Sequence, residues 1–347
     1  MLRRHRPRAA LARALAECDR FVLLGDTLEL RHGPMRQALE TAEPVLRELA
    51  GALAPGAEVV IVPGNHDHRL LRGWLERRAG EPEPQPLGLE APIDWRDGEP
   101  LATLAGWLAP AGVRASYPGV WLRDEVYATH GHYGDVHTTV PLLERLGAGL
   151  MMRIGPATMR LGPATNGRPG RTEDYEAVLA PIYAWIDTVA QGGGFRGRGG
   201  GGLQVRAWRS LRASGPGRGI RGAGMALAFP AAVAVLNRAG VGPFDADVSG
   251  AELRRAALRA FGQVVERLGV EAAWVISGHT HRAGPLPSDE RSEWAAFGGA
   301  SLLNTGSWVY ERGFLGDSPA QSPYRPGFCV VLEDDGPPLL INLLDPA

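Results

Sequence analysis

The segment at residues 58–67 reads Glu58-Val59-Val60-Ile61-Val62-Pro63-Gly64-Asn65-His66-Asp67. After its first residue it is a short apolar run, which turns abruptly polar behind a proline and a glycine. Such a run is typical of a buried parallel strand, and parallel sheets bind ligands at the carboxyl ends of their strands. The segment therefore predicts a strand at 58–62 with functional side chains at its end.

Three other segments repeat this arrangement of an apolar run followed by a polar cluster. The runs end at Gly25-Asp26, at His130-Gly131-His132 and at Gly278-His279-Thr280-His281. Carboxylate, amide and imidazole groups are ligands for manganese, iron and zinc. A neighbouring glycine lets the backbone turn tightly at the end of a strand. Together the four clusters predict a metal site at one edge of a sheet.

Strands and helices alternate along the rest of the chain, which predicts an α/β fold. Strands are expected at 21–24, 126–129, 273–277, 301–305, 327–333 and 338–343. Helices are expected at 8–17, 34–53 and 251–268, and residues 138–190 are expected to be mainly helical with a break at 155–170. A proline-rich loop is expected at 80–100.

Composition excludes several classes of protein. The net charge of -1 gives no overall field towards nucleic acid, so no DNA partner is expected. No window holds about 18 uninterrupted apolar residues, so no transmembrane helix is expected. Cys18 and Cys329 are the only cysteines and lie far apart in the sequence, which fits a reducing compartment. The predicted location is the cytoplasm.

The ordered clusters resemble the motifs of the calcineurin-like metallophosphoesterases, which read D-x-H, G-D-x-x-D, G-N-H-D, a His-Gly pair and G-H-x-H. Residues 64–67 and 278–281 match letter for letter, and residues 304–308 are similar to an N-T-G-S segment of the family. The resemblance covers 20–135 and 270–345. It implies a layered α/β/β/α sandwich. It also implies hydrolysis of a phosphomonoester, phosphodiester or pyrophosphate by a hydroxide that bridges two divalent metals, with manganese, iron or zinc as candidates.

The resemblance also implies which side chains bind metal. Asp26 would bridge both ions. Asn65, His130 and His279 would complete one metal site, and His281 would belong to the other.

Three further residues are expected to act without binding metal. By the same resemblance, His66 would protonate the leaving oxygen or stabilise charge there, and Asp67 would orient a neighbouring histidine. Glu29 stands where the family usually has Asp or Asn, and it is expected to support the site from outside the ligand set.

One family motif is not found in its expected place ahead of Gly25-Asp26. Nothing before Gly25-Asp26 reads D-x-H, so the Asp and His that would complete the second metal site are not present. We expect that the first strand is missing because the chain starts too late. The alternative is an inactive or one-metal member of the family that binds a phosphate ligand or a protein without turnover.

The long interval between His130 and His279 predicts an insertion within the core. Residues 1–137 and 251–347 are assigned to the metallophosphoesterase core, and residues 138–250 to a helical cap that is rich in glycine and arginine. The arrangement is similar in outline to the UDP-diacylglucosamine pyrophosphatases. The expected partner is a small phosphoester, and a nucleotide-linked or lipid-linked substrate stays open.

The cap also holds the candidates for substrate binding. Residues 192–224 contain seven arginines and no acidic residue. Arginine can hold a phosphate bidentately, so Arg206, Arg209 and Arg212 are substrate-binding candidates, together with His132. The alternative for the arginines is a flexible linker that reflects the base composition of the genome. Apolar helices expected at 142–161 and 225–236 leave a peripheral membrane contact open.

Overall fold

The computed structural model describes residues 2–31, 33–139, 169–191, 237–238, 250–310, 312–315 and 318–345. The chain divides into two compact units, which we call the core unit and the inserted unit. The core unit comprises Met1–His132 and Val270–Ala347, and the inserted unit comprises Tyr133–Gly269. The candidates Arg206, Arg209 and Arg212 and the expected helices at 142–161 and 225–236 lie outside the described residues.

The inserted unit is longer than the 138–250 insertion that the sequence predicts. Its described helices are α7 (Thr172–Gln191) and α10 (Gly250–Arg267), and the sequence analysis assigns most of α10 to the core. Within the unit, Arg267 of α10 donates a hydrogen bond to the carbonyl of Pro169. An amphipathic pattern shows that α10 has a buried face, but it does not show which unit covers that face.

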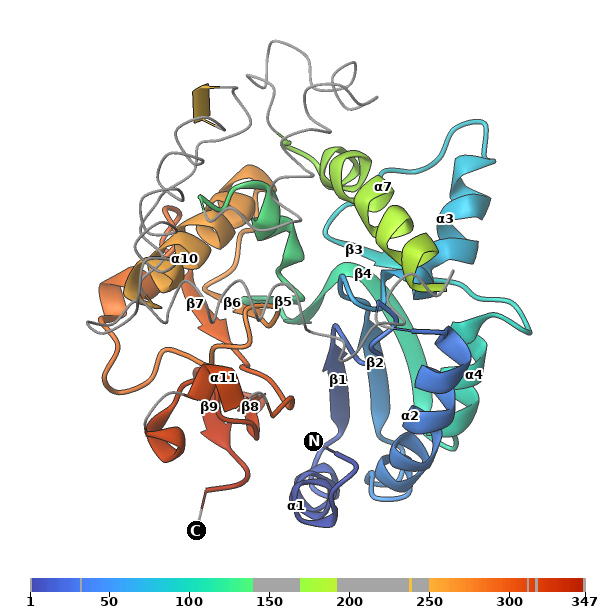
Figure 1. Cartoon of the computed structure of the whole chain (residues 1–347), viewed down its shortest axis with the longest axis horizontal. Coiled ribbons are helices and arrows are strands. Elements are labelled where there is room, and N and C mark those ends of the chain that lie inside the picture. Colours follow the sequence, from blue (N-terminus) through green and yellow to red (C-terminus); the bar gives the residue numbers. More distant parts are fainter. Residues whose placement is uncertain are drawn as a thin grey trace, which may run out of the picture. The chain divides into compact units, whose positions relative to one another are not determined.

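A seven-stranded sheet forms the centre of the core unit (Figure 1). Six strands follow the order β1-β2-β4-β5-β6-β7, and β3 pairs with β4. Their bounds are β1 Arg20–Leu24, β2 Glu58–Val62, β3 Glu90–Pro92, β4 Gly112–Arg123, β5 Val126–Thr129, β6 Trp274–Ser277 and β7 Ser301–Asn304. Strand β4 is antiparallel to β3 and β5, and the other pairs are parallel.

The sheet curls around β4. The first residues of β4 pair with β2 and its last residues pair with β5, so one strand belongs to both halves of the sheet. One buried cluster joins side chains from both halves, namely Val60, Val62, Val120, Val126, Ala128, Ile276 and Leu303. Since β2 and β7 contribute to the same cluster although three strands separate them in the sheet, the two halves share one core.

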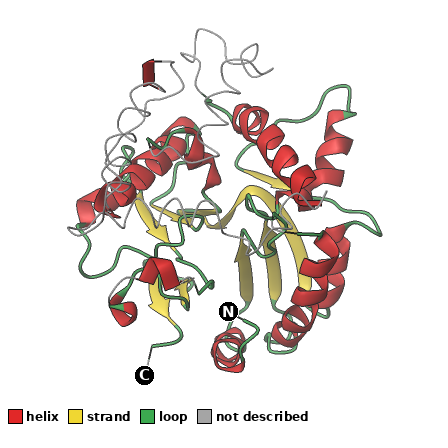
Figure 2. Ribbon diagram, in the orientation of Figure 1, coloured by secondary structure: helices red, strands yellow, loops and turns green. Residues whose placement is uncertain are grey.

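Helices flank the first half of the sheet (Figure 2). Helices α2 (Met35–Ala50) and α4 (Pro100–Leu108) pack against each other. Helix α1 (His5–Leu15) packs on α2 through Leu11, Leu15, Val45 and Leu49, which form a second apolar cluster. Leucine and valine at these spacings place one apolar stripe on each helix, and each fully buried side chain contributes about 1.5–3 kcal/mol to stability.

The remaining elements of the core unit are short. A two-stranded ribbon consists of β8 (Phe328–Val331) and β9 (Leu339–Asn342). The other helices are α3 (Arg72–Ala79) and α11 (Arg312–Leu315) and the 3-10 helices η1 (His68–Leu71), η4 (Arg291–Trp294) and η5 (Pro319–Gln321); η2 (His132–Val136) links the two units.

The structure confirms the α/β class and most of the expected elements. The predicted strands 58–62 and 126–129 have the observed bounds of β2 and β5, and α2 begins directly after Pro34. Helices α3 and α4 and strands β3 and β4 were not predicted. Strand β3 interrupts the expected loop at 80–100, and α4 begins at its last residue. In the described part of the chain, no helix is long and apolar enough to cross a membrane.

Candidate functional site

Four of the predicted ligands lie close together in the core unit. Asp26 follows β1, Asn65 follows β2, His130 follows β5 and His279 follows β6. Nε2 of His130 lies 3.1 Å from Oδ1 of Asn65 and 3.3 Å from Oδ2 of Asp26. Nδ1 of His279 lies 3.2 Å from the same oxygen of Asn65. The ends of four strands thus bring together one carboxylate, one amide and two imidazoles.

The orientation of His130 is fixed by the backbone of β1. Its Nδ1 lies 3.1 Å from the carbonyl of Leu24, and a carbonyl only accepts, so Nδ1 carries the hydrogen. Nε2 is therefore the atom that faces Asn65 and Asp26. Burial disfavours the charged imidazole, but the carboxylate of Asp26 outweighs burial and raises the pKa of His130 to about 9. The cluster thus stabilises a positive charge at Nε2, which either a proton or a metal can supply.

The spacing of these atoms fits a divalent metal. Metal–ligand bonds of about 2.0–2.2 Å place neighbouring donor atoms roughly 3 Å apart. This is close to the separations of the three contacting pairs, His130 with Asn65, His279 with Asn65 and His130 with Asp26. A ligating histidine commonly donates its other ring hydrogen to a carbonyl, as His130 does to Leu24. Among the described residues, no three side chains of His, Cys, Asp or Glu lie together in a way that could hold a metal ion. The oxygen that joins the two histidines belongs to the amide of Asn65.

Three of the predicted ligands have a backbone conformation that is uncommon for residues other than glycine. Asp26, His279 and His281 have φ angles of 52°, 64° and 60°, and they are the only non-glycine residues with positive φ among those that the structure describes. Each costs of order 1–3 kcal/mol and persists only where its surroundings hold it. Such residues cluster at functional sites, and here they coincide with positions that the motifs single out.

Two glycines leave room for this arrangement. A Cβ atom on Gly25, whose φ is +81°, would lie 2.0 Å from Nδ1 of His130. A Cβ atom on Gly64 would lie 2.5 Å from Oδ1 of Asp26. Side chains at these positions would displace the candidate ligands.

Replacing Gly25 with alanine should therefore destabilise the fold more than the same change at a glycine with free space. Gly56 is the matched control, because its φ is +85° and a Cβ atom there would meet nothing within 4 Å. Gly56→Ala should cost about 1–2 kcal/mol for the left-handed backbone alone. Gly25→Ala should cost about 1–3 kcal/mol more through overpacking. Urea denaturation measures both values, and equal losses would contradict the close packing of Gly25 on His130.

All four donor residues belong to the core unit. Comparison with family models, with curated proteins and with solved structures gives no match. The function is therefore inferred from the residues themselves.

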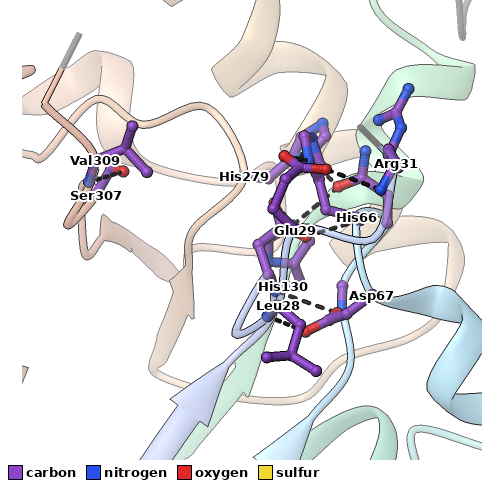
Figure 3. A network of polar contacts seen from close by, with 12 residues as sticks. Leu28, Glu29, Arg31, His66, Asp67, His130, His279, Ser307 and Val309 are labelled. Carbon is purple, nitrogen blue, oxygen red and sulfur yellow. Dashed lines mark hydrogen bonds and ion pairs between the residues drawn. The ribbon is translucent and has the colours of Figure 1, made fainter. Parts of the chain in front are cut away.

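His66 lies beside this cluster and pairs with Glu29 (Figure 3). Its Nδ1 is 2.6 Å from Oε2 of Glu29, and its Nε2 is 4.0 Å from Oδ2 of Asp26. Burial disfavours the charged imidazole, but the hydrogen bond that His66 donates to Glu29 and the charge of Asp26 outweigh it, so the pKa of His66 is raised above its ordinary value. Glu29 thus holds the ring of His66 and takes no part in the contacts that join the four candidate ligands.

Asp67 holds the backbone of two loops (Figure 3). Its carboxylate is fully buried and accepts hydrogen bonds from the backbone amides of Asp26, Leu28 and Gly64 at 2.6–3.3 Å. Burial and the charge of Asp26 raise its pKa to about 6, although the amide hydrogen bonds lower it. The resemblance implies that Asp67 orients a histidine, whereas the hydrogen bonds that Asp67 accepts in the structure come from backbone amides.

The other predicted site residues differ in their surroundings. His132 is buried at 1% exposure, and its Nε2 lies 3.0 Å from the hydroxyl of Tyr117, so its ring is part of the packed interior. Burial lowers the pKa of His281 to about 4, so this imidazole is neutral at pH 7. Within the described part of the chain, no hydrogen bond or ion pair joins His281 to Asp26.

Sequence reasoning did not foresee two contacts that shape the site. The carbonyl of Leu24 fixes the tautomer of His130, and a backbone atom leaves no signal in the sequence. Asn304 binds the turn that carries His279, and its only signal is the N-T-G-S segment. Each contact joins strands that are distant in sequence.

Proposed function

We propose that this chain is a metal-dependent phosphoester hydrolase of the calcineurin-like metallophosphoesterase type. One observation carries the proposal: Asp26, Asn65, His130 and His279 follow four strand ends and are joined in a chain of contacts, His130 to Asp26, His130 to Asn65 and His279 to Asn65, with donor atoms 3.1–3.3 Å apart in each pair. The order of the motifs and the positive φ angles at Asp26 and His279 support it. The finer fold that we propose is the layered α/β/β/α sandwich of that family.

Asp26, Asn65, His130 and His279 would hold one divalent metal, with manganese, iron or zinc as candidates. When bound, the metal supplies Lewis acidity that offsets charge on the phosphoryl oxygens and makes water more acidic. We expect one tightly bound equivalent per chain, because the described residues bring together one such set of four donors.

His66 would act on the leaving group. Its ring is held by Glu29, and its raised pKa keeps a larger fraction protonated near pH 7. A protonated imidazole can donate its hydrogen to the departing oxygen, and this kind of catalysis contributes about 10²–10⁴-fold to rate. Asp67 would keep the loops of Asp26 and Asn65 in place through its bonds to backbone amides.

Changing Glu29 to glutamine should shift the pH dependence of turnover. The carboxylate raises the pKa of His66, so its loss lowers that pKa, and the protonated acid disappears at a lower pH. The alkaline limb of the kcat profile should therefore move to lower pH. Glu43→Gln is the matched control, because Glu43 pairs only with Arg47 on the surface of α2. An unshifted profile in Glu29→Gln would contradict the role of the pair.

Turnover of bis-p-nitrophenyl phosphate by metal-stripped protein, with and without Mn²⁺, tests the proposal. We expect hydrolysis that depends on added metal. The second candidate is a protein that binds a phosphate ligand without turnover; among the described residues the contacts join one set of four donors and not two, which favours it. If the protein binds inorganic phosphate but does not hydrolyse the ester with manganese, iron or zinc added, the result would support that candidate and contradict the proposed hydrolase activity.

The proposed substrates are phosphomonoesters, phosphodiesters and pyrophosphates, and they include nucleotide-linked and lipid-linked esters. The proposed location is the cytoplasm. The positive charges of the metal and of protonated His66 would favour anionic substrates. The arginines of residues 192–224 would add to this preference.

A further inference from the structure

The turn at residues 277–284 carries two of the predicted ligands in an unusual conformation. His279 and His281 both have positive φ, and the backbone amide of Thr280 between them donates to the carbonyl of Gly278 at 2.7 Å. Two left-handed histidines one residue apart cost of order 2–6 kcal/mol together. Contacts from outside the turn must therefore hold it.

Asn304, the last residue of β7, supplies such contacts from its side chain. It is buried at 5% exposure. Its Nδ2 donates to the carbonyl of Gly278 at 2.5 Å and to Oγ1 of Thr280 at 3.1 Å, with a longer contact of 3.3 Å to Oγ of Ser277. Its Oδ1 accepts from the backbone amide of Gly306 at 2.9 Å. The amide thus binds the residues on both sides of His279, and both of its ends are used.

The backbone of Asn304 holds the far end of the same turn. Its amide donates to the carbonyl of Gly284 at 2.8 Å, and the amide of Gly284 donates back at 3.1 Å. A Cβ atom on Gly284 would lie 2.2 Å from the ring of Trp294, so glycine is needed there. One residue of β7 therefore binds the turn before, between and after the two histidines.

We propose that Asn304 is the positioning residue that fixes the left-handed turn and aims His279 at Asn65. The inference rests on the proposed function, because it concerns the metal that these side chains would hold. Aspartate has the shape of asparagine, but an ionised carboxylate cannot donate to Gly278 or Thr280. It would also face the carbonyl of Gly278 with a negative charge. Losing these bonds releases the turn and moves a ligand.

Isothermal titration with Mn²⁺ on the full chain tests this role. Asn304→Asp should lower Mn²⁺ affinity about 10–100-fold, the usual effect of losing a group that orients a ligand. Asn342→Asp is the matched control: Asn342 lies in β9, donates to the carbonyl of Pro326 and accepts from the amide of Leu344, without contacting the turn. The Mn²⁺ affinity of Asn342→Asp should stay within about twofold of the wild type. Its stability should nevertheless fall by about as much as that of Asn304→Asp.

A second variant keeps the test decisive if Asn304→Asp does not fold. Thr280 is exposed, and Thr280→Val removes only the hydroxyl that accepts from Asn304. Its Mn²⁺ affinity should fall about 3–10-fold, with little change in stability. Wild-type affinity in Thr280→Val and in any folded Asn304→Asp would overturn the inference. A wild-type chain that binds no Mn²⁺ would instead contradict the proposed metal site itself, and the role of Asn304 with it.

Discussion

Replacing His66 with alanine should lower kcat for bis-p-nitrophenyl phosphate about 10²–10⁴-fold and leave Mn²⁺ affinity nearly unchanged. The physical reason is the position of the ring. His66 binds Glu29 through Nδ1, and its Nε2 is 4.0 Å from Asp26, outside the contacts that join Asn65, His130 and His279. Steady-state kinetics and metal titration of the same variant measure the two effects separately.

The control for this prediction is a histidine far from the cluster. His5 is exposed on α1, so His5→Ala should change neither kcat nor metal content. Loss of metal from His66→Ala would show that His66 is a ligand. Unchanged kcat would remove it from the proton transfer.

The second large effect is expected at His130. Its ring is 2% exposed, and its Nε2 faces both Asp26 and Asn65. His130→Ala removes a donor atom and the closer of the two imidazoles that face the carboxylate of Asp26. Mn²⁺ affinity should therefore fall by at least about 100-fold, beyond the range seen for residues that only orient a ligand, and turnover should fall with it.

His132 provides the matched control, because it is an equally buried histidine two positions further along the chain. His132→Ala should create a similar cavity and cost about 2–4 kcal/mol of stability, through lost packing and the lost contact to Tyr117. Mn²⁺ affinity should stay within a few fold of the wild type. If both variants lost metal equally, the loss at His130 would be a consequence of general destabilisation.

Much of the fold follows from local patterns. Strands β2 and β5 are short apolar runs closed by a glycine or a histidine cluster, and their bounds match the prediction. Strand β4 escaped because Pro118 and Gly119 stand in its middle, where a break is normally expected. The pairing of β4 passes from β2, at residues 112–115, to β5, at residues 119–123, so Pro118 and Gly119 stand where the strand changes partners.

Two helices were not predicted from the sequence, for different reasons. Helix α3 has charged side chains around most of its surface and buries only Trp74, so it shows no apolar periodicity. Helix α4 begins at Pro100, a favoured first residue of a helix, and this signal lay at the end of the expected loop. Helix α4 could therefore have been predicted from Pro100.

The site was predictable in its composition but not in its geometry. Motif order identified Asp26, Asn65, His130 and His279, which the structure brings together. Asp67 was expected to orient a histidine, but its carboxylate accepts hydrogen bonds from backbone amides. A carboxylate in a tight turn can accept from an amide as readily as from a histidine ring, and the sequence does not distinguish the two. The positive φ angles at the ligands depend on contacts across the sheet, such as those of Asn304, and no local pattern records them.

The central claim is that these four side chains bind one divalent metal. Anomalous diffraction from crystals of the chain soaked in Mn²⁺ tests it most directly. We predict a single strong peak within bonding distance of Oδ2 of Asp26, Oδ1 of Asn65, Nε2 of His130 and Nδ1 of His279. A map without a peak at these atoms, or with its strongest peak elsewhere on the chain, would contradict the account.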